Sequence, residues 1–233
     1  MNENEILKAD NLYKTYGSDE NAVTALSGVN LAIKDGELLV ILGSSGSGKS
    51  TLLNMLGGMD RPDEGTVYYN GEDIFTDGDK SMTAYRRHHV GFIFQSFNLI
   101  TELTALENVK LTAISQDAAE EALIQVGLGD RMTAYPGKFS GGQQQRISIA
   151  RALAKDTSIL LCDEPTGALD YETGKQILEL LENLCREKHK TVVIVTHTQE
   201  IGKMADRVIR MRNGKIIETK ANTEPVSAKD IEW

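Results

Sequence analysis

The glycine-rich stretch from Gly43 to Thr51 is the feature that most constrains the fold of this 233-residue chain. It follows a short aliphatic run, residues 38–42, and leads into residues 49–56, whose pattern is helical. Glycines between a strand and a helix let main-chain N–H groups surround an anion, and the helix directs its positive end to the same place. The stretch therefore predicts a strand–loop–helix unit that cradles phosphate groups within an α/β fold.

The side chains at the end of this loop have separate roles in the predicted site. Lys49 would reach the β- and γ-phosphates of a nucleotide, Ser50 would ligate Mg²⁺, and Thr51 would support the α-phosphate side. The rest of the predicted phosphate-binding loop consists of Gly43, Ser44, Ser45, Gly46, Ser47 and Gly48. The alternative is a chance glycine-serine loop, and the correct flanking elements argue against it.

Two adjacent carboxylates, Asp163 and Glu164, follow the buried strand predicted at residues 158–162. The end of a strand is the usual place for a carboxylate that holds Mg²⁺ through water, which is the role expected of Asp163. Successive residues point in different directions, so Glu164 can instead polarise the attacking water as a general base. The alternative is a pair of capping carboxylates, which the phosphate-binding loop makes the weaker interpretation.

Gln95 and His197 also follow predicted strands, at residues 90–94 and 192–195. The amide of Gln95 can contact both the metal and the lytic water without adding charge. His197 can face the γ-phosphate and orient Glu164 and the water. The other histidines lack such a context and are interpreted as surface residues: His88, His89 and His189.

A second predicted anion-binding helix begins at residues 140–143. The motif consists of Ser140, Gly141, Gly142 and Gln143. Serine is a good N-cap, and the two glycines allow an anion to approach closely. One chain has no evident need for two phosphate-binding helix N-termini, so we expect this one to serve a nucleotide held by another subunit.

Composition limits the classes of partner and compartment. The net charge of −9 argues against a nucleic-acid partner, which would require a basic surface. The two cysteines form neither a zinc spacing nor a disulfide framework, and Cys162 is expected to be a buried, inert thiol in a reducing compartment. The polar, acidic residues 1–5 do not resemble a secretory signal, and no apolar run approaches the ~18 residues that span a bilayer. Any membrane role would therefore come through a partner.

The predicted fold class is α/β: a P-loop NTPase core with a mostly parallel sheet, an antiparallel β portion near the N-terminus and an inserted α-helical subdomain. Strand and helix patterns alternate except between about residues 97 and 153, which are mostly helical. Residues 1–233 are expected to form a single domain. Residues 220–233 are polar and expected to be a loosely held tail in which Ile231 and Trp233 dock.

These motifs, in this order, resemble the ATP-binding subunit of ABC (ATP-binding cassette) transporters over almost the full chain. Residues 140–143 are similar to the signature motif of that family. The resemblance implies ATP and Mg²⁺ as cofactors, a head-to-tail dimer with a second copy of the chain, and an integral membrane permease that holds it at the cytoplasmic face of the membrane. It also implies that Tyr16 stacks on adenine and that Asp170 belongs to a loop that crosses to the other subunit.

Three further segments resemble the macrolide-exporter, lipoprotein-release and bacitracin-resistance type of cassette: residues 53–60, 104–109 and 163–170. The implied function is an ATPase that powers export or mechanotransmission. Phe139 departs from the leucine that usually opens the signature, and residues 109–117 are shorter than is usual in the lobe that meets the permease. Two alternative functions are a soluble ABC ATPase of DNA repair or translation and an ATP-dependent clamp with little hydrolysis. The absence of heptads and of a second cassette argues against the first, and Glu164 with His197 against the second.

Overall fold

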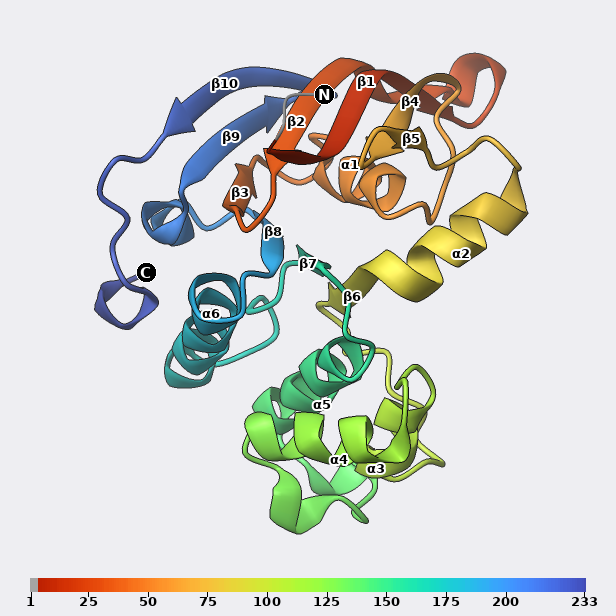
Figure 1. The fold of residues 1–233 in the computed structure, drawn as a ribbon. Coiled ribbons are helices and arrows are strands. Elements are labelled where there is room, and N and C mark those ends of the chain that lie inside the picture. The colour runs from red at the N-terminus through yellow and green to blue at the C-terminus, as the bar shows by residue number, and fades with distance from the viewer. Residues whose placement is uncertain (1–3) are drawn as a thin grey trace.

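The computed structural model describes residues 4–233, which form two β-sheets and a helical lobe (Figure 1). The expected lack of a secretory signal rests partly on residues 1–3, which lie outside the described residues. Among the residues described, no helix combines the length and apolar character needed to cross a membrane.

The central sheet is mostly parallel, as predicted. In the described chain its strand order is β10-β9-β3-β8-β7-β6, and only the β9–β10 pair is antiparallel. The strands are β3 (Leu38–Leu42), β6 (Val90–Phe94), β7 (Ile159–Asp163), β8 (Thr191–Thr196), β9 (Arg207–Arg212) and β10 (Lys215–Ala221). Asn213 and Gly214 between β9 and β10 both have positive φ, the backbone that a tight hairpin with the right-handed strand twist requires.

An antiparallel sheet forms the second layer, with the order β2-β1-β4-β5. Its strands are β1 (Glu5–Tyr16), β2 (Val23–Lys34), β4 (Glu64–Tyr69) and β5 (Glu72–Asp73). Helix α1 (Lys49–Leu56) contributes Leu52 and Leu56 to the apolar core shared by this sheet and the central sheet.

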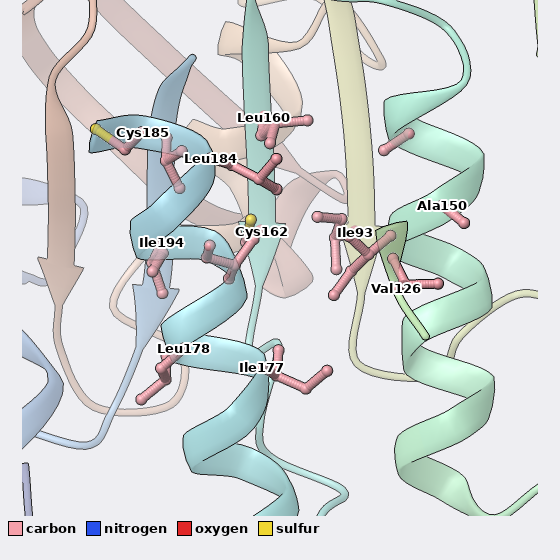
Figure 2. Close-up of a cluster of buried hydrophobic side chains, with 14 of the residues drawn as sticks. Ile93, Val126, Ala150, Leu160, Cys162, Ile177, Leu178, Leu184, Cys185 and Ile194 are labelled. Carbon is pink, nitrogen blue, oxygen red and sulfur yellow. The ribbon is translucent and has the colours of Figure 1, made fainter. Parts of the chain in front are cut away.

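Alternation along the central strands divides the apolar residues between two cores. Leu39 and Ile41 of β3 join the core that contains α1, whereas Leu38 and Val40 join a second core on the opposite face. The second core is drawn in Figure 2, where Cys162 lies beside α6 (Tyr171–Arg186). Cys162 is fully buried and burial raises the pKa of its thiol, as expected of an inert cysteine.

The helical lobe is inserted between β6 and β7 in the sequence. It consists of α3 (Ala105–Lys110), α4 (Gln116–Gln125) and α5 (Gly141–Leu153) (Figure 1). Thr104 begins α3 with a capping box, in which its side chain and that of Glu107 each accept a main-chain N–H. The expected limits of the insert, about residues 97 and 153, stay a prediction.

Helix α2 (Asp79–His89) is an element that the sequence patterns did not predict. Its side chains are mostly polar, and only Met82 and Tyr85 are buried, so its apolar stripe is narrow. His89, interpreted as a surface residue, is half-buried: its ring stacks on Tyr69 with centroids 4.3 Å apart, and burial lowers its pKa.

The last residues are more ordered than a loosely held tail. Strand β10 continues to Ala221, and a 3₁₀ turn at Ala228–Asp230 packs along α6. Ala228 and Ile231 are buried because they complete the apolar core on that helix. Docking of Ile231 was expected from the sequence, whereas Ala228 lies in a polar segment that gives no signal for its burial.

Candidate functional site

The predicted phosphate-binding loop connects the end of β3 to the start of α1 and borders a cavity of about 770 Å³. The cavity brings together residues from five segments of the chain. The predicted site residues that line it are Ser44, Ser45, Gly46, Ser47, Gly48, Lys49, Ser50, Thr51, Gln95, Asp163, Glu164 and His197. A parallel sheet places the carboxyl ends of β3, β6, β7 and β8 at one edge, so the motifs that follow these strands meet there.

Two glycines fix the path of the loop. Gly48, which precedes α1, has φ of +99°, and a Cβ atom there would overlap the carbonyl oxygen of Ala25. Gly43 is enclosed by the Ser47 side chain and by the Met211 carbonyl oxygen, 2.7 Å from where a Cβ atom would lie. The loop therefore needs glycine at both positions to lie this close to the neighbouring main chain.

Lys49 lies in the first turn of α1 with its side chain folded over the loop. Its Nζ donates to the carbonyl oxygens of Gly43 at 2.8 Å and Ser44 at 3.0 Å, and the residue is only 7% exposed. The main-chain contacts hold the ammonium group at the loop, which is where a phosphate anion would be bound.

Asp163 and Ser50 form the oxygen-rich part of the site. Ser50 Oγ donates to Asp163 Oδ1 at 3.1 Å, across the gap between α1 and β7. Burial raises the pKa of Asp163, an effect that the Ser50 hydrogen bond and the charge of Lys49 only partly offset and that Glu164 reinforces. A half-buried carboxylate whose negative charge is only partly compensated, with a hydroxyl beside it, provides oxygen ligands that suit a hard cation such as Mg²⁺.

Glu164 is held by two side chains at the carboxyl end of β8. Thr196 Oγ1 donates to Oε2 at 2.9 Å, and His197 Nδ1 lies 2.8 Å from Oε1. The Glu164 side chain is 16% exposed and the His197 side chain 67% exposed. Glu164 also adopts φ of +47°, an uncommon backbone for a residue with a side chain, which turns its carboxylate into the cavity beside Asp163.

Thr196 is a site residue for which the sequence analysis assigned no role. It is fully buried at the last position of β8, and a strand pattern of apolar residues gives a terminal threonine no distinct signal. Its place directly before His197 is the one clue in the sequence that it contributes to the same arrangement.

Gln95 follows β6 and lines the cavity, where its amide lies against Gly167. A Cβ atom on Gly167 would approach Gln95 Nε2 to 2.8 Å, so the turn after Glu164 leaves space for the glutamine. Tyr16 is not among the described residues that line the cavity. Its hydroxyl donates to Asp60 at 2.8 Å, and partial burial with this hydrogen bond raises its pKa to about 12.

The motif at residues 140–143 is not among the described residues that line this cavity. Ser140 is the exposed N-cap of α5 and forms a capping box with Gln143, whose side chain also accepts from Arg131 at 3.0 Å. Gly142 packs so tightly on Thr173 that a Cβ atom there would overlap it. Asp170 caps α6 by accepting from the Thr173 N–H at 3.1 Å, and the side chain of Thr173 together with this N–H lowers the pKa of Asp170.

The sequence of this chain is similar to those of known proteins. The chain matches the ABC transporter family over residues 26–167. It is 43% identical to the lipoprotein-releasing system ATP-binding protein LolD of Geobacter metallireducens, over 91% of this chain and 98% of that protein. It is 42% identical to the macrolide export ATP-binding/permease protein MacB of Shewanella sp., over 94% of this chain but 35% of that protein. The chain thus spans about a third of the macrolide-export relatives that it matches.

Two solved structures are similar to this chain in both fold and sequence. One is a dimeric, post-hydrolysis state of the ATP-binding cassette MJ0796 bound to ADP and Pi, with a TM-score of 0.85 and 43% identity over 92% of this chain and 98% of that one. The other, cbiO1 from Clostridium perfringens, part of the ABC transporter complex cbiONQ, has a TM-score of 0.83 and 29% identity over 94% of this chain and 89% of that one.

Proposed function

Because the chain belongs to the ABC transporter family, we propose that it is the ATP-binding and ATP-hydrolysing subunit that powers a membrane permease of the exporter type. The observation that carries the proposal is the Glu164 carboxylate, which is held by Thr196 and His197 at the cavity that the phosphate-binding loop borders. A carboxylate fixed there is suited to accept the proton of a water molecule that attacks the γ-phosphate.

The chain's own residues divide the work of binding and cleavage. We assign the phosphates to Lys49 and the main-chain N–H groups of the loop, where positive charge and oriented dipoles meet. We assign Mg²⁺ to Ser50 and Asp163, with Gln95 as a further oxygen donor on the same cavity. The metal, when bound, would neutralise charge on the phosphate oxygens. Glu164 would hold and deprotonate the water, and His197 would keep the Glu164 carboxylate in place.

A second copy of the chain completes the proposed site. Ser140 to Gln143 lie away from the cavity on the same chain, so they are free to approach the nucleotide of a partner. The solved relatives of this fold include dimeric cassettes. A head-to-tail arrangement would place each exposed α5 N-terminus on the partner's bound phosphates, and Asp170 at the contact between subunits.

The proposed permease would bind the helical lobe. LolD and MacB are named for lipoprotein release and macrolide export, and the exporter assignment for this chain rests on that similarity. Leu111 and Ile114 in this lobe are 54% and 70% exposed and lie three residues apart, so together they offer apolar surface that a permease could cover. The chain would then lie at the cytoplasmic face of the membrane through the permease.

Copurification tests the permease. The chain with Glu164→Gln, isolated from native membranes in mild detergent with ATP and Mg²⁺, should carry a stoichiometric integral membrane protein that mass spectrometry identifies. A dimer recovered from the soluble fraction with no membrane partner would contradict the transporter assignment and favour a soluble ABC ATPase.

A prediction for Ser140 tests the head-to-tail dimer. Ser140→Arg should reduce ATP turnover by at least about 10-fold, because a bulky side chain would block the partner's nucleotide, while ATP binding to the monomer stays within about twofold. Loss of the N-cap alone costs about 1 kcal/mol of stability. Ser115→Arg is a matched control, since Ser115 is the exposed N-cap of α4. Equal turnover in the two variants would contradict the role of residues 140–143.

A prediction for Thr196 tests how Glu164 is held. Thr196→Val removes the hydrogen bond to Oε2, and bonds to charged groups contribute about 1.5–3 kcal/mol. ATP turnover should fall by about 10-fold in a steady-state phosphate-release assay, with ATP affinity unchanged. Thr191→Val is the control, because Thr191 is equally buried on the same strand but bonds to Gly36 instead. Full turnover in Thr196→Val would remove this residue from the site.

A further inference from the structure

The segment that follows β10 returns to α6 and is fastened to it at two places. In the last third of the helix, Glu182 Oε2 accepts the N–H of Ala228 at 2.9 Å. In the first turn, the Tyr171 hydroxyl donates to the carbonyl oxygen of Ile231 at 3.1 Å. The two helix positions are 11 residues apart, or roughly 16 Å at the rise of an α-helix. We call residues 227–233, which run between these points, the strap.

The last side chain of the strap, Trp233, lies against the first turn of α6. Its ring centroid is 4.9 Å from that of Tyr171, and a Cβ atom on Gly174 would lie 3.1 Å from its Cζ2. The same Cβ position would be 3.4 Å from Thr166, so this glycine is enclosed between the tryptophan and the turn that follows Glu164. Trp233 thus supports α6 where the helix meets that turn.

A neighbouring residue in the same turn of α6 packs on α5. Thr173, next to Gly174, fills the space that a Cβ atom on Gly142 would need. Gln145 of α5 also donates to the Pro165 carbonyl oxygen at 2.9 Å, in a fully buried contact. A continuous packed path therefore leads from Trp233 through the start of α6 to the N-terminal turn of α5.

This path reaches residues 140–143, which we assigned to the partner's nucleotide, and the turn that ends at Asp170, which we assigned to the contact between subunits. We propose that Trp233 is a positioning residue, which sets both motifs for the contact between subunits; the inference rests on the proposed dimer. Ala228 and Ile231 already cover the apolar face of α6, whereas Trp233 is 38% exposed. Trp233 does not belong to that buried core, and its ring instead contacts Tyr171 and Gly174.

Replacement of Trp233 separates positioning from folding. In the Glu164→Gln chain with ATP and Mg²⁺, Trp233→Ala should raise the dimer dissociation constant by about 5–20-fold in sedimentation experiments, since small misplacements of site groups have large effects. In the chain with Glu164 intact, it should lower kcat by a similar factor. The affinity of the monomer for ATP should stay within twofold, and Trp233→Phe should restore most of the loss because a ring would again rest on Gly174.

Val226→Ala is the matched control, because Val226 is also 38% exposed and precedes the strap. It should leave dimerisation and kcat unchanged. Trp233 is the only tryptophan in the sequence, so its fluorescence gives a second readout that needs no substitution at the strap. ATP with Mg²⁺ should shift its emission in the Glu164→Gln chain, and ADP should not.

The outcomes distinguish the inference from the function on which it rests. A Trp233→Ala chain that dimerises and hydrolyses ATP like wild type, or an emission that stays constant while the dimer forms, would overturn the role of Trp233 alone. A chain with Trp233 intact that forms no ATP-dependent dimer would overturn the proposed assembly, and the inference with it. Equal losses in Trp233→Ala and Trp233→Phe, with ATP affinity also lost, would indicate a purely structural strap and contradict positioning.

Discussion

Glu164→Gln should reduce ATP turnover by about 10²- to 10³-fold while ATP affinity stays within about twofold. Glutamine keeps the size of the side chain and can still accept the hydrogen bond from Thr196 Oγ1. It cannot accept a proton from water, and a positioned general base contributes about 10²- to 10⁴-fold to a rate. Binding and cleavage should therefore separate in this variant, which steady-state phosphate release and calorimetric ATP titration would measure.

The same variant should accumulate as an ATP-bound dimer, because the step that reopens the proposed dimer is blocked. Size-exclusion chromatography with ATP and Mg²⁺ would detect the dimer. Glu187→Gln is the control for the loss of one negative charge, since Glu187 is exposed at the far end of α6. Turnover that remained comparable to wild type would show that Glu164 is not the base and would favour capping as its role.

Lys49→Ala should weaken ATP binding by about 10- to 100-fold. The expected loss corresponds to one hydrogen bond to a charged group, about 1.5–3 kcal/mol, and Lys49 is already held at the loop by two carbonyl oxygens. Titration calorimetry or a fluorescent ATP analogue would measure the affinity of the monomer, so that dimerisation does not contribute.

Lys155→Ala is a close control for this substitution. Lys155 is another partly buried lysine whose Nζ donates to two main-chain carbonyls, those of Arg86 and Val90, far from the phosphate-binding loop in the sequence. Both variants lose a comparable main-chain contact, but only Lys49→Ala should lose ATP affinity. Unchanged affinity in Lys49→Ala would contradict the assignment of the loop.

The separation of the Ser140 motif from the cavity has a consequence for how such a subunit is regulated. In the proposed assembly, the loop, the carboxylates and His197 of one chain would bind a nucleotide alone, and the first turn of α5, which does not line that cavity, would act on the partner's nucleotide. Hydrolysis in the proposed assembly would therefore depend on dimer closure, and any element that sets the α5 and α6 N-termini would affect turnover without touching ATP.

Local patterns were sufficient where one short segment carries both the fold and the chemistry. The aliphatic run of β3, the glycine-rich loop and the start of α1 are consecutive, so their order predicted a strand–loop–helix unit that the structure contains. Gln95, Asp163, Glu164 and His197 were likewise assigned from the sequence to one nucleotide site, and they meet because parallel strands end at one edge of the sheet.

Helix α2 shows where local patterns were insufficient. Its sequence is polar along most of its length, and the two buried side chains, Met82 and Tyr85, give too narrow a stripe for a helical pattern to stand out. Its end at His89 is held instead by a ring from β4 and by Lys155 from beyond α5. Contacts between distant segments, rather than propensity, determine this element.

The sequence by itself determined the family, the α/β core and the identity of most side chains around the cavity, because motifs with fixed spacing encode them locally. The tertiary structure alone decided that Thr196 and His197 both hold Glu164 and that Trp233 reaches Gly174. Each of these depends on two segments meeting in space at a distance of a few ångströms, and only the packing of the folded chain sets such distances.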